Sequence, residues 1–104
     1  MSSAPKFDQG KPALGLIPAL LPLSPLLEIA AVFEFGRQKY GFESWRKGFA
    51  WLRIISACLR HIWAWVGGED LDPESGLPHL AHAAANLLFL LEYQAAGIGD
   101  DDRP

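Results

Sequence analysis

The segment HLAHAAANLLFLLEYQAAG, residues 79–97, contains the strongest structural signal in this sequence. Its leucine and alanine residues recur on every turn up to Gly97, a residue type that often ends helices, so we expect a helix over about 79–96. Apolar groups occupy every side of this helix, and a helix that is apolar all round is buried all round. A chain of 104 residues has few ways to surround one helix, so we expect an oligomer, most simply a two-fold dimer. The alternative is a monomer whose proline-rich N-terminal arm covers the helix.

Two further helices are expected upstream of this segment. Ser24 as N-cap and Pro25 at the first helical position predict a helix over about 25–40. A second helix is expected over about 51–66, and Gly67-Gly68 ends it. Its apolar stripe consists of Ile55, Cys58 or Leu59, Ile62 and Val66. No segment alternates with a period of two for long, so the sequence predicts an all-α bundle of three to four helices, completed by dimerisation.

The length of the chain favours a single domain over residues 1–104. Within it, residues 1–12 are predicted to form an extended arm and residues 97–104 a flexible acidic tail. Residues 13–25 are apolar but interrupted by proline, so only short helical turns are expected there. Residues 41–50 are expected to form a loop.

The composition restricts the possible partners and location. A net charge of −3 without a basic stripe argues against nucleic acid as a partner. A membrane helix over residues 13–33 is excluded because three prolines would break it and Glu28 would be costly in lipid. The single cysteine, Cys58, cannot form an internal disulfide, and the polar N-terminus does not look like a secretory signal. We therefore expect a cytoplasmic protein without a membrane partner.

Three polar residues share one face of the otherwise apolar helix over 79–96. At 100° per residue, His79, His82 and Asn86 fall within a stripe about 60° wide. Each of them would need a partner in a dry interior, so a functional role is favoured over three separate core hydrogen bonds. Polar packing in the core is the alternative.

An acidic loop leads directly into this stripe. It contains Glu69, Asp70, Asp72 and Glu74 within ten residues. Solvation and helix capping are the ordinary explanations for such a loop. Carboxylates beside imidazoles also suit a divalent cation, whether magnesium, manganese or cobalt.

Two upstream segments add cations and aromatic rings. Residues 39–47, KYGFESWRK, mix the two types, as a nucleotide pocket requires for stacking on a base and binding phosphates. A surface loop whose rings plug the end of the bundle is the alternative. Arg60 and His61 lie out of register with the apolar stripe of their helix. Arg60 is either a solvated charge or a phosphate clamp, and His61 a metal ligand or a base.

Seven short strings in this order resemble the bacteriophage dATP/dGTP diphosphohydrolase N-terminal family, a relative of the MazG-like nucleotide pyrophosphohydrolases. The strings are residues 7–12 (FDQGKP), 35–40 (FGRQKY), 45–48 (WRKG), 60–61 (RH), 68–69 (GE), 72–76 (DPESG) and 79–86 (HLAHAAAN). The resemblance covers nearly the whole chain, from about Lys6 to Tyr93. It implies an all-α, divalent-metal enzyme of phage nucleotide-pool control, which would act in the host cytoplasm. The implied reaction is hydrolysis of dATP or dGTP to the monophosphate and pyrophosphate.

The chain departs from the metal motif of MazG-like enzymes, which pair Glu-x-x-Glu on one helix with Glu-x-x-Asp on a later one. No Glu-x-x-Glu is present, and His79-x-x-His82 stands where the second pair would fall. The resulting hypothesis assigns metal binding to Glu69, Asp72, His79, His82 and His61. It assigns catalysis to Glu69, Asp72 and Glu74, and substrate binding to Lys39, Tyr40, Trp45, Arg60 and Asn86. The alternative is a nucleotide-binding protein without catalysis, such as a phage sponge against host defence.

Overall fold

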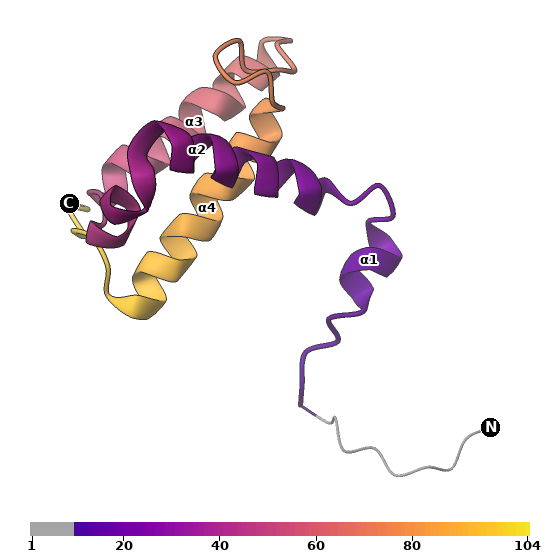
Figure 1. The fold of residues 1–104 in the computed structure, drawn as a ribbon, viewed down its shortest axis with the longest axis horizontal. Coiled ribbons are helices and arrows are strands. Elements are labelled where there is room, and N and C mark those ends of the chain that lie inside the picture. Colours follow the sequence, from indigo (N-terminus) through magenta and orange to yellow (C-terminus); the bar gives the residue numbers. More distant parts are fainter. Residues whose placement is uncertain (1–9) are drawn as a thin grey trace.

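The computed structural model describes residues 10–104, except the side chains of Phe42 and Glu43. It contains the helices α1 (Leu16–Leu20), α2 (Pro25–Lys47), α3 (Trp51–Val66) and α4 (His79–Ala96), shown in Figure 1. No strand occurs within residues 10–104, which confirms the all-α class for that part of the chain. Most of the predicted arm, residues 1–9, lies outside the described part, and residues 10–12 are exposed.

Helices α3 and α4 form an antiparallel hairpin, and α2 crosses over α4 (Figure 1). Both hairpin helices have the predicted bounds. Gly97 adopts the left-handed conformation with φ 68° and ends α4, where its N–H bonds the carbonyl of Tyr93. The loop between the two helices is held by backbone hydrogen bonds, including one of 2.9 Å from the His79 N–H to the Asp70 carbonyl. This loop therefore has a defined path into α4.

Helix α2 corrects two predictions. The helix was expected to end near Tyr40, but it continues to Lys47 with a kink at Gly41, where φ is 78° and ψ is 159°. The helical conformation does break at Gly41, but helical turns resume after it, so residues 41–47 belong mostly to α2 and are not a loop. Ser24 has φ 53° and its side chain forms no cap hydrogen bond, so its predicted N-cap role is wrong, although Pro25 does begin the helix.

The core lies where α2 meets α4. Val32 of α2 packs against Ala81 and Ala85 of α4, and Ala85 is fully buried. Small residues at this crossing let the two helix backbones approach closely. On the hairpin side, Cys58 and Tyr93 are the largest fully buried side chains.

The outer side of α4 is exposed in the single chain. Leu80, Leu87 and Leu91 remain 48%, 46% and 62% exposed, so residues 10–104 of one chain do not bury α4 on all sides. Helix α1 contacts none of the other helices and stands apart from them in Figure 1. The alternative in which the N-terminal arm covers α4 is therefore not seen in the described part of the chain. No helix in residues 10–104 is long and apolar enough to cross a membrane.

The C-terminal residues, predicted to be a flexible tail, pack against the start of α3 instead. The Trp51 N–H donates to the Asp100 carbonyl and the Leu52 N–H donates to Asp102 Oδ1, both at 2.9 Å. A carboxylate at a helix N-terminus satisfies free N–H groups and complements the helix dipole. Gly48 and Gly99 cross here so closely that a Cβ on Gly48 would lie 2.4 Å from the Gly99 nitrogen.

Candidate functional site

Three histidines from two helices meet beside the interhelical loop. His61 comes from α3, and His79 and His82 come from adjacent turns of α4. The Nδ1 atoms of His61 and His79 are 2.8 Å apart. The His61 and His82 rings stack with centroids 4.4 Å apart and an interplanar angle of 8°. His79 and His82 are buried and His61 is half-buried, so the imidazoles form a compact and largely dry cluster.

Two carboxylates of the loop reach this cluster. Glu69 Oε1 lies 2.7 Å from His79 Nε2, and Asp72 Oδ2 lies 3.8 Å from His82 Nε2. A tight turn aims Asp72 inward, because its Oδ2 accepts a hydrogen bond of 2.9 Å from the Ser75 N–H. The Ser75 hydroxyl lies 2.7 Å from His82 Nε2 and completes the turn. Glu74 also lines the cleft, but its carboxylate pairs with Lys39 of α2 and not with a histidine.

The hydrogen bonds determine how neutral His79 is protonated. A carboxylate of Glu69 only accepts, so the facing Nε2 of His79 carries the hydrogen and its Nδ1 presents a lone pair. In the absence of another ligand, His61 donates to that lone pair from its own Nδ1. In its other tautomer His61 also presents a lone pair there, and both Nδ1 atoms can then face one cation.

Burial keeps two of the histidines neutral. It lowers the pKa of His61 and of His82 below the usual value of 6.5, and the neighbouring imidazoles lower these pKa values further. Asp72 raises the pKa of both histidines, but not enough to reverse the effect of burial. Burial alone would raise the pKa of Asp72, but hydrogen bonds from the Ser75 N–H and hydroxyl, with the field of His82, lower it overall. The cluster thus offers neutral nitrogens beside an ionised carboxylate near neutral pH.

This donor set fits a divalent transition metal. One ligand atom each from His61, Asp72 and His79 lie within 4.8 Å of one another. Two imidazole nitrogens with one carboxylate suit manganese or cobalt better than magnesium, which prefers oxygen ligands. Glu69 accepts from the far nitrogen of His79, the arrangement that commonly orients a metal-binding histidine. Glu69 and His82, both predicted as ligands, lie beside this donor group and are not part of it.

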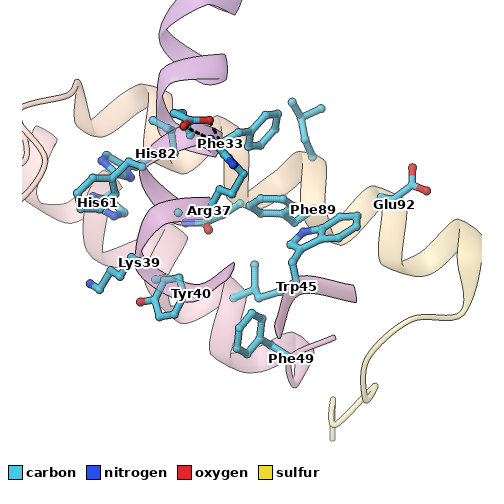
Figure 2. A pocket seen from close by; sticks show the side chains of 18 of the residues that line it. Phe33, Arg37, Lys39, Tyr40, Trp45, Phe49, His61, His82, Phe89 and Glu92 are labelled. Atoms are coloured by element: carbon cyan, nitrogen blue, oxygen red, sulfur yellow. Dashed lines mark hydrogen bonds and ion pairs between the residues drawn. The ribbon is translucent and has the colours of Figure 1, made fainter. Parts of the chain in front are cut away.

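A cleft of about 1000 Å³ extends from the histidine cluster along the inner side of α4 (Figure 2). His82, Asn86, Phe89 and Tyr93 follow one another along its wall. At the far end, the ring of Trp45 lies 5.5 Å from that of Phe89. The cleft therefore has a polar end, lined by His61, Asp72 and His82, and an aromatic end. His79 contacts His61 but does not itself line the cleft.

Most of the predicted substrate-binding residues line this cleft. They are Lys39, Tyr40, Trp45 and Asn86. Lys39 Nζ lies 2.5 Å from Glu74 Oε1, so these two residues bridge α2 to the acidic loop at the polar end. Arg60 is exposed and does not line the cleft.

The sequence reasoning missed Arg53, which does line the cleft. Its guanidinium lies 4.8 Å from the centroid of the Phe49 ring. Arg53, Ala57 and His61 recur every four residues and so share a stripe of α3. That spacing could have identified Arg53, in place of Arg60, as the arginine on the same side as His61.

Two polar groups of the cleft lack partners within residues 10–104. The indole Nε1 of Trp45 is buried without a hydrogen bond. The side-chain amide of Asn86 also forms no hydrogen bond with the described residues, although it lines the cleft. A buried donor left unpaired costs about 1–3 kcal/mol, so the Trp45 indole favours a ligand that supplies a hydrogen-bond acceptor. The half-buried Asn86 amide is available to the same ligand.

A helical hairpin crossed by a third helix, with histidines and carboxylates at one end of an aromatic cleft, defines a small all-α protein with a candidate metal centre. The chain belongs to the family described as dATP/dGTP diphosphohydrolase, N-terminal, whose sequence profile matches residues 2–103. It is also 41% identical over 85 residues to a dATP/dGTP diphosphohydrolase of Salmonella phage PMBT28. That match covers 82% of this chain but only 28% of the relative. No solved structure matches the chain, and the MazG-like fold remains a prediction.

Proposed function

We propose that this chain hydrolyses a deoxypurine triphosphate, dATP or dGTP, to the monophosphate and pyrophosphate with the help of a divalent metal ion. The observation that carries the proposal is the donor group of His61, Asp72 and His79, of which His61 and Asp72 line one end of an aromatic cleft. The name of the phage relative supports the substrate class. Because the chain spans less than a third of that relative, the activity of this part alone is a proposal.

The polar end of the cleft would hold the phosphates. A metal ion bound by His61, Asp72 and His79 would polarise phosphate oxygens and lower the pKa of a water molecule. Lys39 would neutralise charge on the phosphates by exchanging its partner Glu74 for a phosphate oxygen. The freed Glu74 carboxylate would accept a hydrogen bond from the attacking water and orient it. Glu69 would keep the His79 ring in place through its hydrogen bond to Nε2.

The aromatic end would hold the base. His82 and Phe89 are two turns apart on α4, which corresponds to about 10 Å along the helix axis. This separation suits a sugar between a phosphate at His82 and a base at Phe89. Asn86 lies between them with an unpaired amide and would bind the sugar. Trp45 or Tyr40 would stack on the base, and Arg53 can donate to the acceptor atoms on a purine edge.

Nucleotide binding without hydrolysis is the second candidate function. It is favoured by the absence of Glu-x-x-Glu and by the short coverage of the relative, since residues needed for turnover can lie in its remaining length. The same cleft would then capture the nucleotide, and a metal would not be required for binding.

Product analysis distinguishes the two functions. The purified chain is incubated with each deoxynucleoside triphosphate and with manganese, cobalt or magnesium, with and without EDTA. Monophosphate and pyrophosphate from a purine substrate, lost with EDTA, are expected. No turnover with any metal, together with nucleotide binding in EDTA, would favour the binding protein.

Two matched variants test the role of the loop. Asp72→Asn is expected to abolish turnover while the helical circular dichroism is retained. Asp70→Asn makes the same change in charge two residues away, outside the cleft lining, and is expected to leave turnover within about twofold, as is usual for surface substitutions. Equal activity in the two variants would remove Asp72 from the proposed mechanism.

A further inference from the structure

The outer side of α4 exposes a regular apolar stripe. Leu80, Ala84, Leu87 and Leu91 are spaced by four, three and four residues, and the three leucines are 46–62% exposed. This spacing is that of a helix which packs along another helix with a heptad pattern. The only Asp, Glu, Lys or Arg of α4 is Glu92, which lies about 100° around the helix from Leu91 and lines the cleft.

The outer side of α3 has a stripe with the same spacing. Its positions are Leu52, Ile55, Leu59, Ile62 and Val66. Leu59 and Val66 are 56% and 71% exposed, and the neighbouring Trp63 is 83% exposed. The stripe lies opposite the side of α3 that carries His61 into the cleft, since His61 is about 160° around the helix from Leu59. This apolar face of the hairpin, formed by the two stripes, thus points away from the candidate site. Of its residues, Leu91 at the C-terminal end also lines the cleft, and the others do not.

Several observations restrict what covers the hairpin face. Helix α1 contacts neither α3 nor α4. A strongly charged partner is disfavoured because neither stripe contains a charged residue. Six exposed residues of the two stripes and the adjacent Trp63 together leave roughly 800 Å² accessible, the area that each partner buries in a standard-size interface. These residues are Leu52, Leu59, Trp63, Val66, Leu80, Leu87 and Leu91.

We infer that the hairpin face binds the same face of a second copy of this chain, forming a four-helix bundle about a two-fold axis. An antiparallel hairpin with matched stripes on both helices is self-complementary under such an axis, because each stripe meets a stripe of equal spacing. The two candidate sites then face away from the interface, on opposite sides of the dimer. This inference does not rest on the proposed catalytic function.

Solution mass tests the inference directly. Size-exclusion chromatography with light scattering, at about 100 µM chain, is expected to give twice the chain mass of 11.4 kDa. The double variant Leu59→Glu/Leu87→Glu places charges on both stripes and is expected to give the mass of one chain. Leu23→Glu is the matched control, because Leu23 is 95% exposed and lies outside the hairpin face. It is expected to remain dimeric.

Cysteine scanning covers the case in which the double variant does not fold. The native Cys58 is 1% exposed, so it does not compete in cross-linking. Single cysteines at positions 80, 84, 87 and 91 are oxidised, and at least one is expected to give a disulfide-linked dimer, while Leu23→Cys gives none. A monomeric wild type at about 100 µM would overturn the inference. A dimer that survives the double variant, or cross-links only through Leu23→Cys, would also overturn it by placing the interface elsewhere.

Discussion

The substitution Glu69→Gln tests whether the histidine cluster binds metal. The Glu69 carboxylate accepts a hydrogen bond of 2.7 Å from His79 Nε2, and no other carboxylate in residues 10–104 pairs with this histidine. Glutamine can still accept that hydrogen bond through its amide oxygen. The substitution therefore removes the negative charge that makes His79 a better ligand but leaves the geometry nearly unchanged.

The expected magnitude follows from the exposure of Glu69. Partners of metal-binding histidines usually contribute 10–100-fold to metal affinity. The Glu69 side chain is 53% exposed, so solvent screens its charge and the effect belongs at the lower end of that range. We expect a loss of about tenfold in the affinity for manganese or cobalt, equivalent to about 1.4 kcal/mol. The buried His79→Ala variant, which removes the ligand itself, is expected to abolish binding.

Isothermal titration calorimetry with each metal measures the effect, and the absorption spectrum of bound cobalt reports the ligand set. Asp70→Asn is the matched control, because it removes the same charge from the adjacent residue, whose side chain pairs with no described residue. Equal losses for the two variants would mean that only the net charge of the loop matters. A wild-type chain that binds neither metal would refute the metal site as a whole.

Three further predictions concern stability and substrate binding. Burial lowers the pKa of His61 and His82, so the unfolded chain binds more protons below the usual pKa of 6.5. The free energy of unfolding, measured by urea titration in EDTA, is therefore expected to fall as the pH decreases from about 6.5 to the lowered pKa values of the two histidines. An increase in the free energy of unfolding over this pH range would contradict burial of the neutral histidines. Gly48→Ala is expected to destabilise the fold by more than about 1 kcal/mol. The reason is that φ of Gly48 is 85° and that the new Cβ would lie 2.4 Å from the Gly99 nitrogen. An unchanged melting temperature would show that this close contact is absent. Arg53→Ala is expected to weaken nucleotide binding, measured by fluorescence titration, about tenfold by loss of a charged hydrogen bond. Arg60→Ala is expected to change the affinity little, because Arg60 does not line the cleft. A larger loss for Arg60→Ala than for Arg53→Ala would show that Arg60 is the arginine that binds the nucleotide.

Local sequence determined much of this protein because helical periodicity acts over a few residues. The apolar spacing and the following glycines predicted both ends of α3 and α4, and Pro25 marked the start of α2. The stripe of His79, His82 and Asn86 was readable for the same reason, since residues on one helix keep fixed angles to one another. The family resemblance rested on the order of short strings, which also needs no tertiary information.

Only the tertiary structure decided which groups meet across elements. The approach of His61 to His79 depends on the register between α3 and α4, and no pattern within either helix sets that register. Loop direction is not periodic, so the sequence could not tell that Asp72 turns inward while Glu74 reaches Lys39. Likewise, a buried side of α4 and an exposed one look alike in a sequence that is apolar all round. The packing of α2 and α3 against one half of α4 distinguishes them, and the apolar half that remains exposed is the surface available to a second copy.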